Sequence, residues 1–376
     1  MIRIFLCLFL AVTGCSKTGN DGPNQEPTNN NTSDTVGDTT DESNTTGETQ
    51  DPSDTDTPTQ WGELSNNPAQ TFFASDLSEA VRDGVNHGLQ KAAEAWGNYG
   101  PLEYWVLGTE SEAGLALITE FCERRESLGQ WSLDQCMDHH TRADSDHNFM
   151  SYLALGQQVV AENTPMGSMG RNGNRDWGIH LFTSSYPFGF DGIFEGIIAE
   201  EEIKTLFHEY FHAVQHAHIF TMDYDTRDQL LGPTWFVEGG AEFMAEYTTA
   251  KLWAQGELFT TEGASFPTLR ERMEWKLIGG KQNRDDNCPG KQLAEIDYGD
   301  ACSYAAYELG AWGNAYLQHR AGEDALLQVF LPSVENLGWE TAFEQAFGMS
   351  ADSFYADFEV FLELPLQEQL AILPTF

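Results

Sequence analysis

The sequence predicts an α+β fold with a mixed first lobe and a mainly helical second lobe. Before residue 215, short aromatic and β-branched segments alternate with segments of helical period. Beyond Pro233, the apolar residues mostly recur every three or four positions, which is typical of helices. The residues from 61 onward are numerous enough for one large two-lobed domain or for two domains. We expect the first lobe over 61–215 and the second over 216–376.

Individual elements follow from the same patterns. Strands are predicted at 102–107 and 176–184, where aromatic and β-branched residues gather. Helices are predicted where apolar residues repeat with a period near 3.6. These segments are 77–96, 113–123, 149–160, the segment that begins after residue 202, 234–254, 301–319, 323–331, 339–346 and 350–364.

The first 14 residues have the features of a bacterial lipoprotein signal peptide. A basic start at Arg3 is followed by an apolar run over 4–12, which is too short to span a bilayer. Small residues then precede Cys15, as in the lipobox whose cysteine is lipidated. We expect lipidation at Cys15 and a place in the bacterial cell envelope, with Ser16 favouring the outer membrane or cell surface. A plain secretory signal with an incidental cysteine is the alternative.

Residues 15–60 are expected to form a disordered tether that begins at the lipidated cysteine. Thr, Asp, Asn, Gly and Pro dominate, with ten acidic side chains and one lysine over 16–60. Such a segment has too little apolar surface to fold. Residues 61–376 carry 49 acidic side chains and 17 basic ones. This balance excludes a basic nucleic-acid-binding face and favours neutral or cationic peptides as partners. We expect a monomer that meets the membrane only through its lipid.

Four cysteines remain in the exported domain. Cys122 and Cys136 are 14 residues apart, and Cys288 and Cys302 have the same separation. Because the envelope is oxidising, two local disulfides are the simplest of the three pairings. A cysteine metal site is the alternative, but the sequence contains no CxxC.

The most informative segment is His208-Glu209-Tyr210-Phe211-His212, which has the pattern HExxH. Two histidines at positions i and i+4 lie on one face of a helix, so both imidazoles can reach one metal ion. Glu209, beside the first histidine, can contact a water molecule at that metal and act as a general base. Zinc is the expected metal, and an interior histidine pair on an apolar helix is the alternative.

A third ligand is expected from Glu238, which stands 26 residues after His212 within Trp235-Phe236-Val237-Glu238-Gly239-Gly240-Ala241-Glu242. Glu238 would complete a His₂Glu set and leave the fourth position to water. Glu242, one helical turn further, can hold a ligand imidazole through its other ring nitrogen. Without such a role, the two carboxylates would only repel each other or form a solvated helix face.

The HEYFH and WFVEGGAE segments resemble those of the gluzincin metallopeptidases, most closely the catalytic domains of bacterial collagenases. The resemblance covers about 200–364 and implies a two-lobed zincin-like fold and peptide-bond hydrolysis. Tyr307, in YELGA, resembles a tyrosine that stabilises the oxyanion in aminopeptidases of the clan, with Tyr304 and Tyr298 as competitors. The strand at 176–184 is the candidate edge strand for an extended peptide substrate. No GxMEN segment is found, which favours endopeptidase over exopeptidase action.

Two alternative ligand assignments follow from nearby residues. His218 lies where metzincins place a third histidine, but Gln215 occupies the position of the glycine that would break the helix. His216 would lie about 6 Å past His212 along the axis. We expect both histidines to be packing or surface residues.

One further polar cluster could hold a second cation, such as calcium, or form a polar loop. Asp138, His139 and His140, followed by Asp144, Asp146 and His147, are more typical of a polar loop, since their order matches no defined binding loop. The alternative to an enzyme as a whole is a surface lipoprotein that uses a peptidase-like fold for binding. The presence of Glu209 disfavours that alternative.

Overall fold

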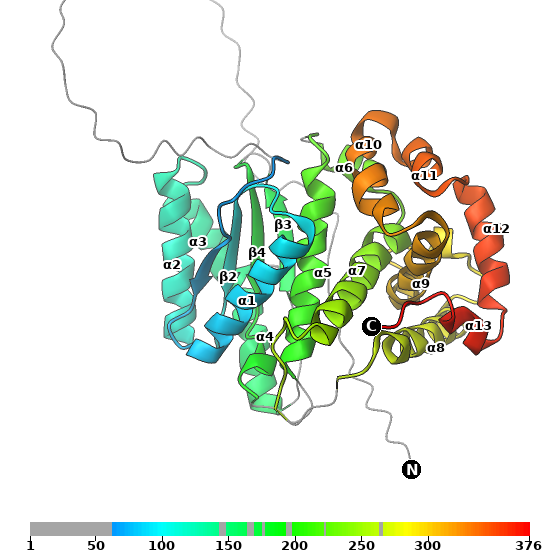
Figure 1. Cartoon of the computed structure of the whole chain (residues 1–376). Coiled ribbons are helices and arrows are strands. Elements are labelled where there is room, and N and C mark those ends of the chain that lie inside the picture. Colours follow the sequence, from blue (N-terminus) through cyan, green and yellow to red (C-terminus); the bar gives the residue numbers. More distant parts are fainter. Residues whose placement is uncertain are drawn as a thin grey trace, which may run out of the picture. The chain divides into compact units, whose positions relative to one another are not determined.

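The computed structural model describes residues 62–142, 148–163, 169–174, 177–192, 198–221, 223–262 and 266–376 (Figure 1). The described residues belong to one compact unit. Its fold is mixed α+β, as predicted, and it is mostly helical. The expected signal peptide, Cys15 and the tether lie outside the described residues. So do Asp144, Asp146 and His147 of the polar loop.

Four strands form one sheet in the first half of the chain. They are β1 (Gln70–Phe73), β2 (Leu102–Val106), β3 (Met169–Asn174) and β4 (Ile179–Ser184), in the order β1-β2-β4-β3. The first three strands of that order are parallel, and β3 runs antiparallel to β4 at the edge. The expectation that 176–184 is an edge strand is therefore wrong, because β4 pairs on both sides. The alternation of polar and apolar residues along one strand does not show whether other strands pair with it on one side or on both.

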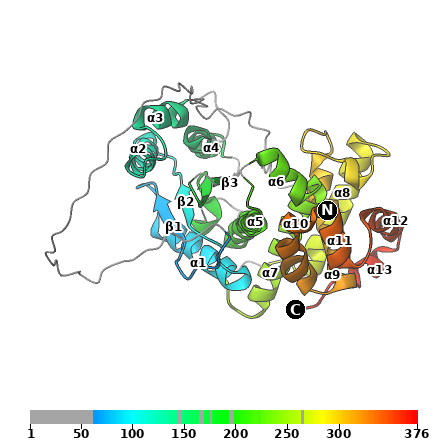
Figure 2. The same cartoon turned by 90° about the horizontal axis from the view of Figure 1, so that it is seen from above.

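Successive residues of β2 point to opposite faces of the sheet, as the pleat requires. Trp105 packs edge-on against Phe121 and Phe149, with ring centroids 5.0 and 6.0 Å away. These two rings belong to α2 (Ser111–Ser127) and α4 (Phe149–Glu162). On the other face, Tyr104 donates a 2.7 Å hydrogen bond to Ser184 of β4. Helices α2, α4 and α3 (Leu133–Thr141) thus cover one side of the sheet (Figure 2).

The other side of the sheet is covered by α1 (Glu79–Trp96) and α5 (Ala199–Ala217), which pack against each other (Figure 2). Helix α1 connects the parallel strands β1 and β2, which no tight turn could join. The Ser78 side chain accepts a hydrogen bond from the Val81 amide at the start of α1, and Gly97, with φ of +92°, ends it.

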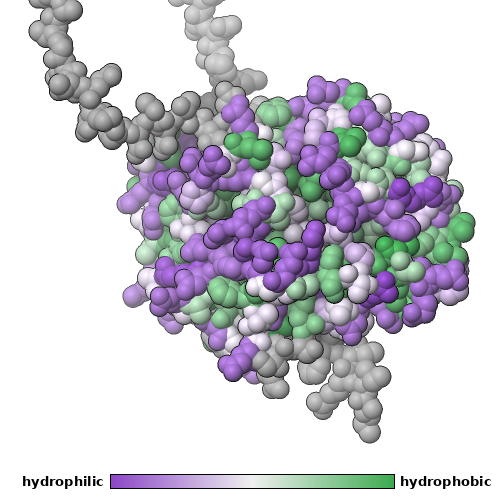
Figure 3. All heavy atoms as spheres, in the orientation of Figure 1, coloured by the Kyte–Doolittle hydropathy of each residue, from purple (hydrophilic) through white to green (hydrophobic). Residues whose placement is uncertain are grey.

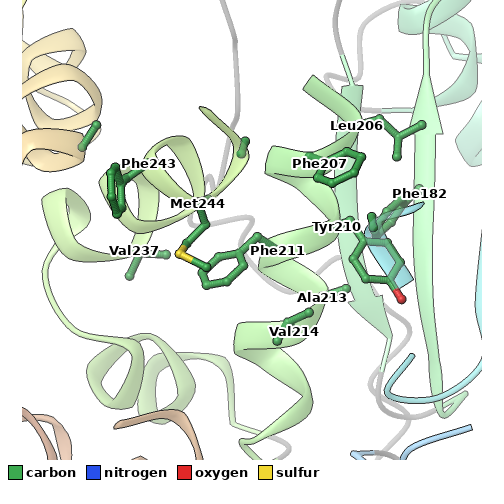
Figure 4. Packing of buried hydrophobic residues seen from close by; sticks show 14 of the residues in the cluster. Phe182, Leu206, Phe207, Tyr210, Phe211, Ala213, Val214, Val237, Phe243 and Met244 are labelled. Carbon is green, nitrogen blue, oxygen red and sulfur yellow. The ribbon is translucent and has the colours of Figure 1, made fainter. Parts of the chain in front are cut away.

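Helix α5 also packs against α7 (Thr234–Ala254), which connects the sheet to the helical half. Both helices are buried along most of their lengths, polar side chains included. Phe211 of α5 points toward Met244 of α7, whereas Leu206 and Tyr210 on the opposite side of α5 lie toward Phe182 of β4 (Figure 4). The helix is therefore held between the sheet and α7.

The second half of the chain is helical in every element described after residue 223. A six-residue π-helix, Ala325–Phe330, precedes α10. Two 3₁₀ turns, Phe188–Phe190 and Leu293–Glu295, lie elsewhere in the chain. The remaining helices are α6 (Tyr224–Leu231), α8 (Leu269–Asn287), α9 (Ser303–Ala321), α10 (Leu331–Leu337), α11 (Trp339–Phe347), α12 (Ala351–Leu362) and α13 (Leu366–Leu370).

Helices α7 and α9 touch backbone to backbone. A Cβ atom built on Gly239 would lie 2.2 Å from the carbonyl carbon of Gly310. A Cβ on Gly310 would lie 2.4 Å from the carbonyl oxygen of Trp235. Only glycine permits such an approach, because any other residue places a carbon atom where the partner backbone lies. The two helices therefore have one fixed crossing point, next to Glu238.

Both predicted disulfides are present. Cys122 and Cys136 join α2 to α3, with their Cα atoms 5.5 Å apart. Cys288 and Cys302 join the end of α8 to the start of α9, with a Cα separation of 5.8 Å. The second bridge closes the segment that contains Tyr298.

The surface is mainly hydrophilic on the face shown in Figure 3, with hydrophobic residues scattered between. None of the helices in the described ranges is long and apolar enough to cross a membrane.

Candidate metal centre

The HExxH segment lies within α5, where every residue from Leu206 to Ala217 is buried. Three glutamates, Glu200, Glu201 and Glu202, occupy the first turn of this helix, where negative charge is favoured by the helix dipole. His208 and His212 lie one turn apart, as the sequence spacing requires. Glu238 comes from the first turns of α7 and is fully buried.

The three predicted ligand atoms form a nearly equilateral triangle. The Nε2 atoms of His208 and His212 are 3.2 Å apart. The Oε2 atom of Glu238 lies 3.2 Å from Nε2 of His212 and 3.3 Å from Nε2 of His208. Zinc bound at about 2.0–2.1 Å in a tetrahedron separates its ligands by roughly 3.3–3.4 Å. The three side chains thus have the spacing of three corners of a zinc tetrahedron.

Hydrogen bonds to the other ring nitrogens orient both imidazoles. Gln215 donates its amide nitrogen to the carbonyl of Val237 at 3.0 Å, so its oxygen faces Nδ1 of His212 at 2.8 Å. That oxygen can only accept, and Nδ1 of His212 therefore carries the proton. In the same way, Nδ1 of His208 donates to Oε2 of Glu242 at 2.9 Å. Both Nε2 lone pairs are then directed toward Glu238, and three acceptors face one point.

Three acceptors that converge repel one another unless a proton on Nε2 or a metal ion lies between them. Burial alone would lower the pKa of His208, but hydrogen bonds to Glu238 and Glu242 raise it to about 10. Burial would raise the pKa of Glu238, yet the charge of His212 and the hydrogen bonds to both histidines hold it well below its ordinary range. The centre therefore attracts positive charge, which a metal ion can supply as well as protons.

Glu209 is 3% exposed and lies beside His208, whose pKa its charge also raises. Burial, and then the charge of Glu209, raise the pKa of Tyr152 above its ordinary value. Tyr152 belongs to α4, and Glu209 therefore lies close enough to the sheet half to act electrostatically on it.

The three candidate tyrosines occupy different environments. Tyr298 donates its hydroxyl to Oε1 of Glu238 at 2.7 Å and so holds the oxygen that faces away from the histidines. The ring of Tyr307 lies nearly parallel to that of His208, with centroids 6.3 Å apart. Tyr304 is 49% exposed. The contact between Tyr298 and Glu238 was missed by sequence reasoning, which considered Tyr298 only as an oxyanion donor.

His218 lies outside the ligand cluster. It forms the C-cap of α5, where its Nδ1 contacts the carbonyl oxygen of Val214 at 2.9 Å and its ring lies 4.9 Å from that of Tyr99. Helix α5 continues unbroken through Gln215 to Ala217, as expected for a position without glycine. His216 is buried and also lies outside the cluster.

Within the described ranges, His208, His212 and Glu238 are the one group of His, Cys, Asp and Glu side chains spaced to hold a metal ion. Asp138, His139 and His140 are not part of such a group. His140 instead packs among aromatic rings, 5.0 Å from Phe121 and 4.7 Å from Phe149. A calcium site therefore gains no support from the residues that the structure describes.

No protein-family model, curated protein or solved structure matches the chain.

Proposed function

We propose that the protein is a zinc metallopeptidase of gluzincin type, in which His208, His212 and Glu238 hold one zinc ion. The observation that supports this most directly is the triangle of three acceptor atoms at 3.2–3.3 Å, with both histidine tautomers set for metal binding. Zinc, when bound, supplies a Lewis acid that polarises the scissile carbonyl and acidifies water.

The chain's own residues would perform the remaining steps. Glu209 takes the proton from the attacking water and passes it to the leaving amine. Tyr307, or one of its two competitors, donates its hydroxyl to the oxyanion that develops on the carbonyl. Strand β3 replaces β4 as the candidate for pairing with an extended peptide, because β3 is the edge strand next to α5.

The wider proposal concerns fold and location. We propose a zincin-like domain whose first lobe contains the sheet and α5 and whose second contains α6–α13. We also propose that Cys15 anchors it by a lipid in the bacterial cell envelope, as a monomeric endopeptidase. The residues that carry the anchor lie outside the described part of the chain.

The decisive experiment measures zinc stoichiometry by atomic absorption after dialysis against a weak chelator. Parent, Glu238→Ala, His218→Ala and Glu242→Ala are compared, and each is incubated with a peptide library whose products are read by mass spectrometry. We expect about one zinc in the parent and in His218→Ala, none in Glu238→Ala, and affinity or activity lowered roughly 10–100-fold in Glu242→Ala.

The other outcomes distinguish the alternatives. Zinc lost from His218→Ala and kept by Glu238→Ala would replace the gluzincin assignment with the metzincin one. A parent that binds no zinc would reject the metallopeptidase and favour the surface lipoprotein that only binds partners.

A further inference from the structure

Glu242 lies between the candidate metal ligand His208 and two lysines. Its Oε2 accepts the hydrogen bond from His208. Its Oε1 lies 2.5 Å from Nζ of Lys276 in α8 and 3.2 Å from Nζ of Lys204 in α5. Each oxygen therefore has a separate task, and the ammonium groups come from helices on two sides of α7.

The same lysines continue into a buried cluster of alternating charges. Both also contact Oε1 of Glu246, at 3.4 Å from Lys204 and 3.5 Å from Lys276. Lys276 further contacts Glu308 of α9 at 3.3 Å, and Arg272 of α8 lies 3.4 Å from Glu246. Arg272 in turn pairs with Glu201 of α5. The cluster thus joins α5, α7, α8 and α9 beside the metal centre.

Stability alone does not account for this arrangement. Each ion taken from water into the interior loses much of its hydration free energy, and packed apolar residues in its place often stabilise the fold as much. Lys276 and Glu242 are each only 8% exposed. What the ion pairs do provide is position, because a carboxylate with one oxygen held by two cations has little freedom to rotate.

We propose that Lys276, assisted by Lys204, is a positioning residue for the metal centre. The two lysines hold Glu242 in place, so that His208 presents Nε2 to the metal. The inference rests on the proposed function, since it assumes that His208 is a zinc ligand. It adds residues that support Glu242, the partner of a candidate ligand. It also assigns a role to α8, a helix that the sequence patterns did not predict.

The test is a double-mutant cycle on the zinc dissociation constant, measured by competition with a chromophoric chelator. The proteins are the parent, Lys276→Met, Glu242→Gln and the double variant. We expect Lys276→Met to bind zinc about tenfold more weakly, as a supporting partner of a ligand does. Because Lys276 acts through Glu242, adding Lys276→Met to Glu242→Gln should change the constant by less than about twofold.

Arg284→Met is the matched control. Arg284 is a largely buried cation on the same helix, but its partner is Glu359 of α12 at 2.9 Å. Its loss should leave the zinc constant unchanged even where it lowers the unfolding midpoint. If Lys276→Met fails to fold, Lys204→Met provides the same test from α5, where the side chain is 15% exposed.

Three outcomes would reject the inference. One is a parent-like zinc constant in both lysine variants. Another is full additivity with Glu242→Gln, which would indicate a general effect on packing. The third is an equal loss in Arg284→Met. In each of these cases the parent still binds zinc and the proposed function stands, whereas a parent without zinc would reject the proposed function itself.

Discussion

Each candidate ligand has its second polar atom held by a different partner. Glu242 of α7 holds His208, Gln215 of α5 holds His212, and Tyr298 holds Glu238. Since such partners fix ring orientation and tautomer, the three candidate ligand atoms are oriented by the protein alone. Of the partners, the sequence predicted Glu242 from its spacing. It did not predict Gln215 or Tyr298, because a glutamine within a helix and a tyrosine in a loop are compatible with many roles.

Replacement of Glu209 by Gln should separate metal binding from turnover. Glu209 is not expected to be a ligand, so Glu209→Gln should bind zinc like the parent. It should lower kcat by several orders of magnitude, because the amide cannot accept the proton from water. Zinc content and peptide hydrolysis are measured on the same preparation. Undiminished hydrolysis would contradict the proposed mechanism.

Tyr298 and Tyr307 should give opposite results. Tyr298→Phe removes the hydrogen bond to Glu238 and should weaken zinc binding about tenfold. Tyr307→Phe should keep the zinc constant and lower kcat about 10²–10³-fold, as does the loss of one oxyanion donor. Tyr304→Phe, at the competing position, should change neither the zinc constant nor kcat. If Tyr304→Phe lowers kcat and Tyr307→Phe does not, the oxyanion donor lies one helical turn earlier.

At the scale of elements, the sequence predicted the helices with regular apolar spacing and missed those without it. The predicted 234–254 agrees with α7 in full. Helix α8 was missed because Gly279 and Gly280 interrupt a segment rich in charge. Its Arg272 and Lys276 are buried, but charged residues in a sequence usually indicate an exposed surface. Strand β3 was missed because MGRNGN contains no β-branched or aromatic residue, and its pairing with β4 determines its conformation.

The crossing of α7 and α9 gives a prediction about helix position. Gly239→Ala places a methyl group within the backbone of α9, so the helices must separate. We expect the free energy of unfolding to fall by about 1–3 kcal/mol and zinc binding to weaken, because Glu238 is the preceding residue. Urea unfolding and zinc competition measure the two effects.

Gly279→Ala is the matched control on α8, where the nearest heavy atom lies 3.8 Å from the added carbon. Alanine should there stabilise the helix by up to about 1 kcal/mol without a change in zinc binding. If Gly239→Ala behaves like Gly279→Ala, the backbone contact does not position Glu238.

At the scale of the whole molecule, the excess of acidic side chains should select substrates by charge. From residue 61 onward, 49 acidic side chains face 17 basic ones. Long-range attraction of this kind weakens with salt, because the Debye length falls from about 30 Å at 0.01 M to about 3 Å at 1 M. Peptides that differ only in flanking residues should therefore be distinguished best at low salt.

The measurement compares kcat/KM for one cleavable peptide flanked by lysines with the same peptide flanked by glutamates. We expect the lysine peptide to be preferred several-fold at low ionic strength and the ratio to approach one near 1 M salt. A ratio that does not respond to salt would indicate that local contacts, rather than the net charge of the domain, determine the preference.

The crossing at Gly239 and Gly310 has a consequence for protein engineering. Glu238 immediately precedes one of these glycines, and Tyr307 lies one turn before the other on α9. A single contact that involves no side chain therefore lies within one helical turn of both the third candidate ligand and the candidate oxyanion donor, and helps to fix their positions. Residues on the exposed surface of α9 can be varied while this backbone contact stays in place. An atom added at either glycine is expected to force the two helices apart.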